Sequence, residues 1–254
     1  MALTLPTSGS LCVPHRGPAR LVAWALSYLL PAACAGCGAR LGIDQRQGLC
    51  LDCWRALEPR PRPACARCAE PLPSPAPACP RCRRQPPPYD WAEAIWEYAP
   101  PARGAVLAFK YGHIPGLAAP LAEAALHLSG QRLARERPVL VPVPLHAARQ
   151  RERGANAAEA LARALAAPLG LRVARALERP HGTTPQAGLG RQARQRNADA
   201  SFSLARPEEV FGRRAVIVDD VLTTGATARA CARLLRGAGA RDIGILALTR
   251  ARLE

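Results

Sequence analysis

The chain has 254 residues, enough for one α/β domain and a small additional module. Its 35 basic and 19 acidic residues give a formal net charge of +16, which favours anionic partners such as phosphorylated ligands, nucleic acid or an acidic protein. The longest apolar run, residues 21–30, is too short for a transmembrane helix, so we expect no membrane span.

The N-terminal segment predicts a disordered tail over residues 1–20, rich in Gly, Pro and Ser, and a short amphipathic helix over residues 21–31. Arg16 and Arg20 precede the apolar run and small residues follow it, as in a secretion or lipoprotein signal. We reject that interpretation because Cys34 also begins a regular array of cysteine pairs. The expected location is therefore cytoplasmic.

Eight of the ten cysteines form four CxxC pairs, separated by 12, 11 and 10 residues. A CxxC turn directs two thiolates to one point, and two such turns complete a tetrahedral zinc site. Disulfides suit a small secreted domain, and a redox CxxC does not recur four times in series, so the spacing favours zinc. The expected ligands are Cys34, Cys37, Cys50, Cys53, Cys65, Cys68, Cys79 and Cys82.

The array predicts two structural Zn²⁺ ions in a double zinc ribbon, because all-cysteine sites are closed to substrate and a module this short needs metal to fold. Sequential grouping places the first two pairs on one ion and the last two on the other. Interleaved grouping is the alternative, but sequential grouping closes shorter loops and is favoured on that ground.

Three prolines at 86–88 form a stiff linker and predict a domain boundary between a module at 21–85 and a domain at 89–254. Beyond the linker, strands and helices alternate, which predicts an α/β fold with a mainly parallel sheet flanked by helices and ligands at the strand C-termini. Strands are expected at 91–98, 139–143, 201–204, 216–218 and 243–248, and helices at 102–110, 117–133 and 156–167.

Residues 215–227, AVIVDDVLTTGAT, are the most informative segment of the chain. Apolar residues predict a buried strand that ends at Asp219 and Asp220, followed by a hydroxyl-rich turn and a helix start. Amides of the turn and helix start favour an anion, and threonine hydroxyls donate to phosphate oxygens. The carboxylates accept hydrogen bonds from ribose hydroxyls, directly or through Mg²⁺. An ordinary strand-turn-helix with an Asp-Asp cap is the alternative.

This segment resembles the loop of type I phosphoribosyltransferases that binds 5-phosphoribosyl-1-pyrophosphate (PRPP). The resemblance implies a PRPP site with Mg²⁺ as the companion ion and Asp219 and Asp220 as the catalytic pair. The expected PRPP-binding residues of the loop are Asp219, Asp220, Val221, Leu222, Thr223, Thr224, Gly225, Ala226 and Thr227.

With the cysteine array, Lys-Tyr-Gly at 110–112, Val-Pro-Val-Pro at 141–144 and this loop in one order, the chain resembles the ComF family from about residue 21 to its end. The resemblance implies a type I phosphoribosyltransferase-like fold and a link to natural competence and DNA uptake. It also implies pyrophosphate contacts from Pro144, Leu145 and Arg149, although a solvated basic face explains the arginine equally well.

The resemblance is incomplete at one place. The family's Arg-Gly-Phe-Asn-Gln run is replaced here by residues 153–157, Arg-Gly-Ala-Asn-Ala, so that Asn156 is expected either in an altered acceptor site or as a helix cap. Residues 181–202 match the family's loop before the ligand strand, and its glycines suit a lid over PRPP, although a polar surface loop is the alternative.

These features support an enzyme that transfers a phosphoribosyl group from PRPP to an unidentified acceptor. A protein that senses PRPP without turnover is the first alternative, because the loop explains binding but not bond cleavage. A module that binds single-stranded DNA, alone or with proteins of the uptake machinery, is the second, and net charge favours it. The low aromatic content, 4% of residues, argues against extensive base stacking.

Overall fold

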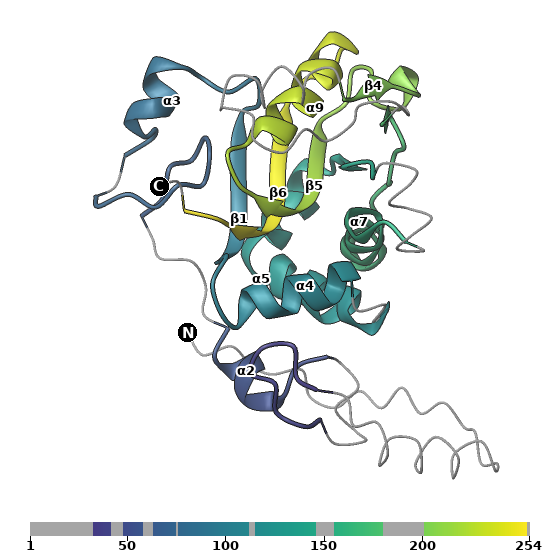
Figure 1. Ribbon diagram of the computed structural model, residues 1–254. Coiled ribbons are helices and arrows are strands. Elements are labelled where there is room, and N and C mark those ends of the chain that lie inside the picture. Colours follow the sequence, from purple (N-terminus) through teal and green to yellow (C-terminus); the bar gives the residue numbers. More distant parts are fainter. Residues whose placement is uncertain are drawn as a thin grey trace, which may run out of the picture.

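The computed structural model describes residues 33–41, 48–57, 63–74, 76–111, 115–145, 155–179 and 201–252. Its centre is a four-stranded parallel sheet with the strand order β1-β6-β5-β2 (Figure 1). The strands are β1 (Trp91–Glu97), β6 (Ile243–Arg250), β5 (Ala215–Leu222) and β2 (Val139–Pro142). The predicted α/β class with a parallel sheet is confirmed.

Helices cover both faces of the sheet, which is why its strands are apolar on both sides. In β5, Val216 and Val218 belong to one buried cluster, whereas Ala215 and Ile217 belong to the other. Strand β6 is buried at every position. This burial, at about 25 cal/mol per Å² of apolar surface, supplies the main stabilisation of the domain.

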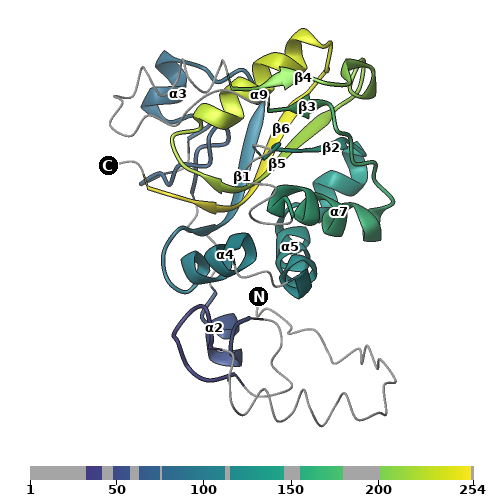
Figure 2. The same cartoon turned by 45° about the vertical axis from the view of Figure 1, so that its right-hand side comes forward.

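Three helices pack on one face and one on the other (Figures 1 and 2). Helices α4 (Ala102–Tyr111), α5 (Ala118–Glu136) and α7 (Ala157–Leu169) share the first face, and α9 (Ala226–Gly237) covers the second. A short 3₁₀ turn, η1 (Pro115–Leu117), leads into α5. None of the helices in the described ranges is long and apolar enough to cross a membrane.

A second, antiparallel sheet joins β3 (Leu177–Glu178) to β4 (Ser203–Leu204). It follows Val173, which forms a parallel bridge with Leu140 of β2, and it is followed by a 3₁₀ turn, η2 (Pro207–Glu209). This small sheet therefore lies beyond the β2 edge of the main sheet.

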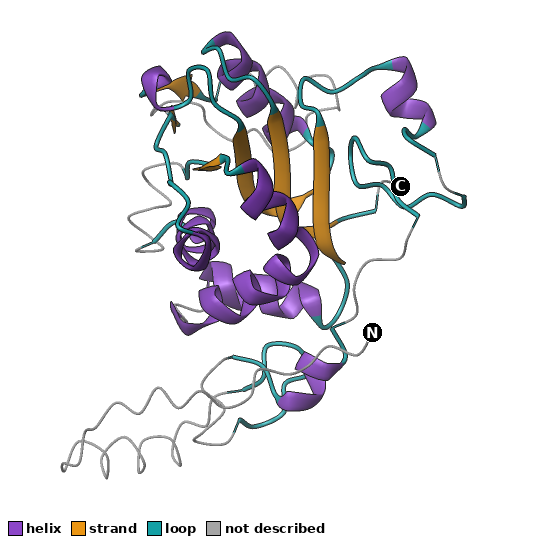
Figure 3. Cartoon of the chain, turned by 180° about the vertical axis from the view of Figure 1, so that it is seen from behind, coloured by secondary structure: helices purple, strands orange, loops and turns teal. Residues whose placement is uncertain are grey.

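The two cysteine-rich ribbons lie apart from one another (Figure 3). The first contains α2 (Leu51–Arg55) and packs against α4, where the Ala35 carbonyl approaches Gly104. The second contains α3 (Pro80–Arg84) and packs against the β1 edge of the sheet, where the amide of Ala92 donates to the carbonyl of Ala66 at 3.0 Å.

Within the described residues, the elements expected from the sequence are present, with corrected ends. The strand expected at 216–218 runs from Ala215 to Leu222, so the prediction that it ends at the acidic pair is wrong. It continues because β6 also extends past its expected end, and Leu222 pairs with Arg250. The strand expected at 201–204 is only Ser203–Leu204. The helix expected at 21–31 lies outside the described residues.

Candidate functional site

A cavity of about 370 Å³ opens where β2 and β5 end, the edge at which parallel α/β sheets bind ligands. Its lining brings together residues from both strand ends, from the starts of α7 and α9, from the end of α4 and from the small sheet. Seven of the predicted site residues line it: Pro144, Leu145, Asp219, Asp220, Val221, Thr223 and Thr227.

Asp219 and Asp220 lie near the end of β5, which runs to Leu222. Because side chains alternate along a strand, the two carboxylates leave the backbone in opposite directions, yet both reach the cavity. The Oδ1 atom of Asp219 accepts a hydrogen bond from the amide of Asp220 at 2.8 Å. Burial raises the pKa of Asp219 well above its usual range, and the charge of Asp220 raises it further.

Lys110, at the end of α4, supplies the positive charge beside this pair. Its Nζ atom lies 2.8 Å from Oδ1 of Asp220, and both side chains are largely buried. Lys110 also lowers the pKa of Asp219, opposing the effect of burial. Lys110 is therefore part of the cavity, and its charge at the end of α4 is paired with a carboxylate.

The loop after β5 is shaped for a close backbone approach. Gly225 has φ +77°, in the left-handed region that favours glycine, and it is the residue before α9. The hydroxyl oxygen of Thr224 accepts from the amide of Ala226, the first residue of α9, at 3.3 Å. Leu222 is buried in the core, away from the cavity lining. The loop thus presents Thr223 and Thr227 to the cavity.

On the β2 side, Pro144 and Leu145 line the cavity, whereas Arg149 lies outside the described residues. Asn156 is a helix cap: its side chain accepts from the amide of Ala158 at 3.0 Å and donates to the carbonyl of Val143 at 3.0 Å. It thereby fixes the start of α7 against the end of β2. Asn156 also lines the cavity, so it is a helix cap that lies at the cavity wall.

The cavity is also lined by residues that were not among the predicted site residues. Tyr98 and Tyr111 come from the β1 and α4 sides, and Arg179 and Phe202 come from the ends of the small sheet. The Arg179 guanidinium lies over the Phe202 ring, 5.2 Å from its centroid. Tyr111 and Phe202 belong to segments that match family patterns, Lys-Tyr-Gly at 110–112 and the loop at 181–202, whereas Tyr98 and Arg179 do not. The remaining residues of the segment at 181–202 except Ser201 lie outside the described ranges.

The cysteines form two groups of four, each from consecutive CxxC pairs: Cys34, Cys37, Cys50 and Cys53, and Cys65, Cys68, Cys79 and Cys82. Within each group all sulfur atoms lie within 4.8 Å of one another. Tetrahedral zinc with bonds of about 2.3 Å separates its sulfur ligands by about 3.8 Å. The Cys37–Cys50 and Cys68–Cys79 sulfurs are 3.7 and 3.8 Å apart, so the thiols fit zinc in sequential grouping.

Comparison with known proteins agrees with both parts of the chain. A double zinc ribbon family model matches residues 25–85, and a phosphoribosyl transferase domain model matches residues 110–253. Competence protein F of Haemophilus influenzae is 32% identical over 225 residues, which cover 86% of this chain and 96% of that protein. This chain belongs to the ComF family.

A second relative of this ComF-family chain is the DNA utilization protein YhgH of Salmonella typhimurium, 32% identical over 228 residues that cover 87% of this chain and 98% of the relative. Among solved structures, a purine phosphoribosyltransferase from Pyrococcus horikoshii matches 51% of this chain and 82% of its own, with 16% identity and a TM-score of 0.33.

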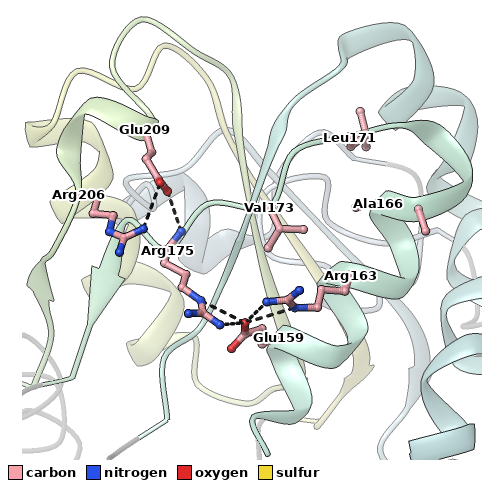
Figure 4. A pocket seen from close by; sticks show the side chains of 9 residues that line it. Glu159, Arg163, Ala166, Leu171, Val173, Arg175, Arg206 and Glu209 are labelled. Atoms are coloured by element: carbon pink, nitrogen blue, oxygen red, sulfur yellow. Dashed lines mark hydrogen bonds and ion pairs between the residues drawn. The ribbon is translucent and has the colours of Figure 1, made fainter.

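The ComF-family chain also has a cavity of about 400 Å³ outside this site, between α7, the Val173 strand segment and η2 (Figure 4). Glu159 accepts from Arg163 and Arg175 at 2.8 and 2.5 Å, and Glu209 accepts from the Arg175 amide at 2.8 Å. Burial raises the pKa of Glu159, but the hydrogen bonds and charges of Arg175 and Arg163 lower it by a larger amount, so that its pKa lies below the usual range. Through Arg175, these interactions join α7 and η2 to the segment just before β3.

Proposed function

We propose that this chain binds Mg²⁺-PRPP in the cavity at the ends of β2 and β5 and transfers the phosphoribosyl group to an acceptor. We place this activity in the cytoplasm and in DNA uptake or utilization, the processes named for its relatives. We also propose the boundary near residues 86–88, between a zinc-binding module and a phosphoribosyltransferase-like domain.

The observation that carries the proposal is the meeting of two kinds of group in one cavity. Asp219 and Asp220 offer carboxylate oxygens, which suit ribose hydroxyls and Mg²⁺, and Thr223 and Thr227 offer hydroxyls at a helix start, which suit a phosphate. A capping turn alone does not require both acids to face a cavity. Pro144 and Leu145 face this cavity from the neighbouring strand, where the pyrophosphate of the same ligand is expected.

The transfer replaces one bond at the anomeric carbon of ribose. The bond to pyrophosphate breaks, the pyrophosphate leaves with the electron pair, and a lone pair of the acceptor forms the new bond. Positive charge develops on the ring during this exchange, and the carboxylates of Asp219 and Asp220 stabilise it while holding the hydroxyls. The carboxylates of Asp219 and Asp220 would also hold Mg²⁺, which would supply positive charge near the departing pyrophosphate.

Net charge supports a second candidate function, binding of single-stranded DNA, because +16 on 254 residues favours a polyanion. Sensing of PRPP without turnover is compatible with the same cavity. All three functions fit a protein whose relatives are named for competence and DNA utilization.

The test is calorimetric titration of Mg²⁺-PRPP into the zinc-loaded wild type and into Asp219→Asn/Asp220→Asn. Loss of two charge-assisted interactions, each of about 1.5–3 kcal/mol, predicts that affinity falls by about a hundredfold or more. Asp242→Asn is the matched control, because Asp242 lies before β6, at the opposite end of the sheet, and pairs with Arg214 on the surface.

Equal PRPP affinity in the double variant and the wild type would remove the proposed site. Binding that is lost only in the double variant would justify an acceptor screen with release of pyrophosphate as the readout. A folded, zinc-loaded wild type that ignores PRPP but retains single-stranded DNA would favour the second candidate.

A further inference from the structure

A single buried arginine connects the second zinc ribbon to the loop between β5 and α9, residues 223–225, which is the phosphate loop of the proposed site. Arg250, the last residue of β6, is only 2% exposed. Its guanidinium donates to the carbonyls of Leu222 at 2.9 Å and Thr223, both in the segment that leads into the loop. The same guanidinium donates to Oε2 of Glu70 at 2.5 Å. A buried charge of this kind is stable only when it is paired, so Glu70 is essential to the arrangement.

The bonds to Arg250 help to fix where the loop amides point, together with the amide of Ala251, which also donates to the carbonyl of Leu222 at 3.0 Å. A peptide unit is planar and trans, so its N–H lies opposite its carbonyl. With the carbonyls of Leu222 and Thr223 directed to the guanidinium, the amides of Thr223 and Thr224 are directed away from it. Thr223 lies on the cavity wall. Arg250 therefore orients peptide groups that are proposed to face the 5′-phosphate.

Glu70 is held in place by the zinc-binding turn itself. Its carbonyl accepts from the amide of Cys65 at 2.7 Å. The first ribbon repeats this geometry, with the carbonyl of Ala39 accepting from the amide of Cys34 at 2.7 Å. The equivalent position thus carries an alanine in the first ribbon and a carboxylate in the second. The two ribbons share a turn, but only the second uses it to reach the loop.

Two further contacts join the end of the second ribbon to the same loop. Arg229, in the first turn of α9, donates to the carbonyls of Gln85 and Pro86 at 3.4 and 3.5 Å. The buried Tyr89 hydroxyl lies 3.6 Å from the place where a β-carbon at Gly225 would stand. Figure 1 shows α3 beside the β1 edge and α2 below α4, so the first ribbon lies away from this region.

We propose that the second zinc ribbon is a structural part of the PRPP site, in which Glu70 and Arg250 act as positioning residues for the phosphate loop. Metal binding in the second ribbon then strengthens PRPP binding, whereas the first ribbon serves the packing of α4. The identity of the ligand rests on the function proposed above, but the positioning of the loop does not.

The experiment compares Glu70→Gln with Asp52→Asn, a charge-matched change at an exposed position of the first ribbon. Both variants are loaded with zinc, checked by native mass spectrometry, and measured for Mg²⁺-PRPP affinity and for amide hydrogen exchange of residues 222–226. We expect Glu70→Gln to weaken PRPP binding about tenfold and to accelerate exchange of the loop, because Arg250 loses its counter-charge. Asp52→Asn should leave both quantities unchanged.

A second variant separates positioning from stability. Glu70→Gln/Arg250→Met removes both charges, so it should recover much of any thermal stability that Glu70→Gln loses. It also removes the donor to the two carbonyls, so PRPP affinity should stay low and loop exchange fast. Recovery of affinity together with stability would assign the pair a purely structural role.

The inference would be overturned, whatever the PRPP result, if the amides of residues 222–226 exchanged at the wild-type rate in both Glu70→Gln and the double variant. If the wild type does not bind PRPP but exchange rises in Glu70→Gln, the proposed function fails and the positioning role stands. If the wild type binds PRPP and Glu70→Gln binds it equally well with unchanged exchange, the inference alone fails.

Discussion

The acidic pair of the cavity is in contact with a lysine. Lys110 is the only lysine in the chain, and its Nζ atom lies 2.8 Å from Asp220. Two adjacent carboxylates at least partly shielded from water repel one another, and a nearby cation reduces the cost of ionising both. This is why Lys110 acts against the burial that raises the pKa of Asp219.

Substitution of Lys110 therefore has a pH-dependent consequence. In the proposed site, Asp219 must be ionised to hold the ribose of Mg²⁺-PRPP, and its raised pKa means that binding should strengthen as pH rises through that pKa. Lys110→Met removes a charge that lowers this pKa, so the binding profile should move to higher pH. Lys110→Arg keeps the charge and should leave the profile near that of the wild type.

The measurement is PRPP affinity by calorimetry across mildly acidic to mildly alkaline pH for the three proteins. A profile for Lys110→Met that coincides with the wild type would show that Lys110 has no influence on Asp219. A uniform loss of affinity at every pH would instead indicate a direct contact between Lys110 and the ligand.

At the scale of elements, docking of the first ribbon requires a glycine at position 104 of α4. A β-carbon at Gly104 of α4 would stand 1.9 Å from the carbonyl oxygen of Ala35 and 3.1 Å from the α-carbon of Gly36. Both are backbone atoms and cannot rotate aside. Helix α4 and the ribbon backbone are therefore in direct contact at this glycine.

Gly104→Ala should consequently destabilise the protein although alanine favours helix. Overpacking against backbone costs about 1–3 kcal/mol, more than the gain of up to about 1 kcal/mol in helix propensity. Gly130→Ala in α5 is the matched control, because the nearest atom to its β-carbon is 3.6 Å away in Leu126. Thermal unfolding should show a lower midpoint for the first variant and an equal or higher one for the second. An equal midpoint for Gly104→Ala would contradict the close packing.

Prediction from the sequence succeeded where chemistry is local. The CxxC pairs and the two aspartates followed by threonines are each recognisable within a short stretch of sequence, so both thiol groups and seven residues of the cavity lining were predicted. Pairs that join distant segments were not, because no local pattern links Glu70 to Arg250, 180 residues away. The length of β5 was missed for the same reason, since Leu222 extends the strand by pairing with β6.

At the scale of the whole molecule, the two ribbons differ in how they connect to the core. Cys34 and Cys53 of the first ribbon belong to the large apolar cluster that contains α4, α5 and α7. The four thiols of the second ribbon form a cluster of their own, against which Leu72 and Ala78 pack among the described residues. The second ribbon therefore has little apolar burial to hold it together without metal.

Metal removal should affect the two ribbons unequally. Native mass spectrometry is expected to find two zinc ions per chain, each contributing about 10 kcal/mol or more to folding of its ribbon. After chelation, hydrogen exchange should become fast throughout residues 63–74 and 76–85, whereas residues 33–41 and 48–57 keep partial protection from their contact with the main cluster. The central sheet should stay protected, because both of its faces are buried mainly by helices. Restored zinc should return both ribbons to slow exchange.

Two outcomes would contradict this prediction. Equal protection of the second ribbon before and after chelation would show that metal does not support its fold. Unfolding of the sheet together with the ribbons would show that the chain is one cooperative unit and not several separate ones.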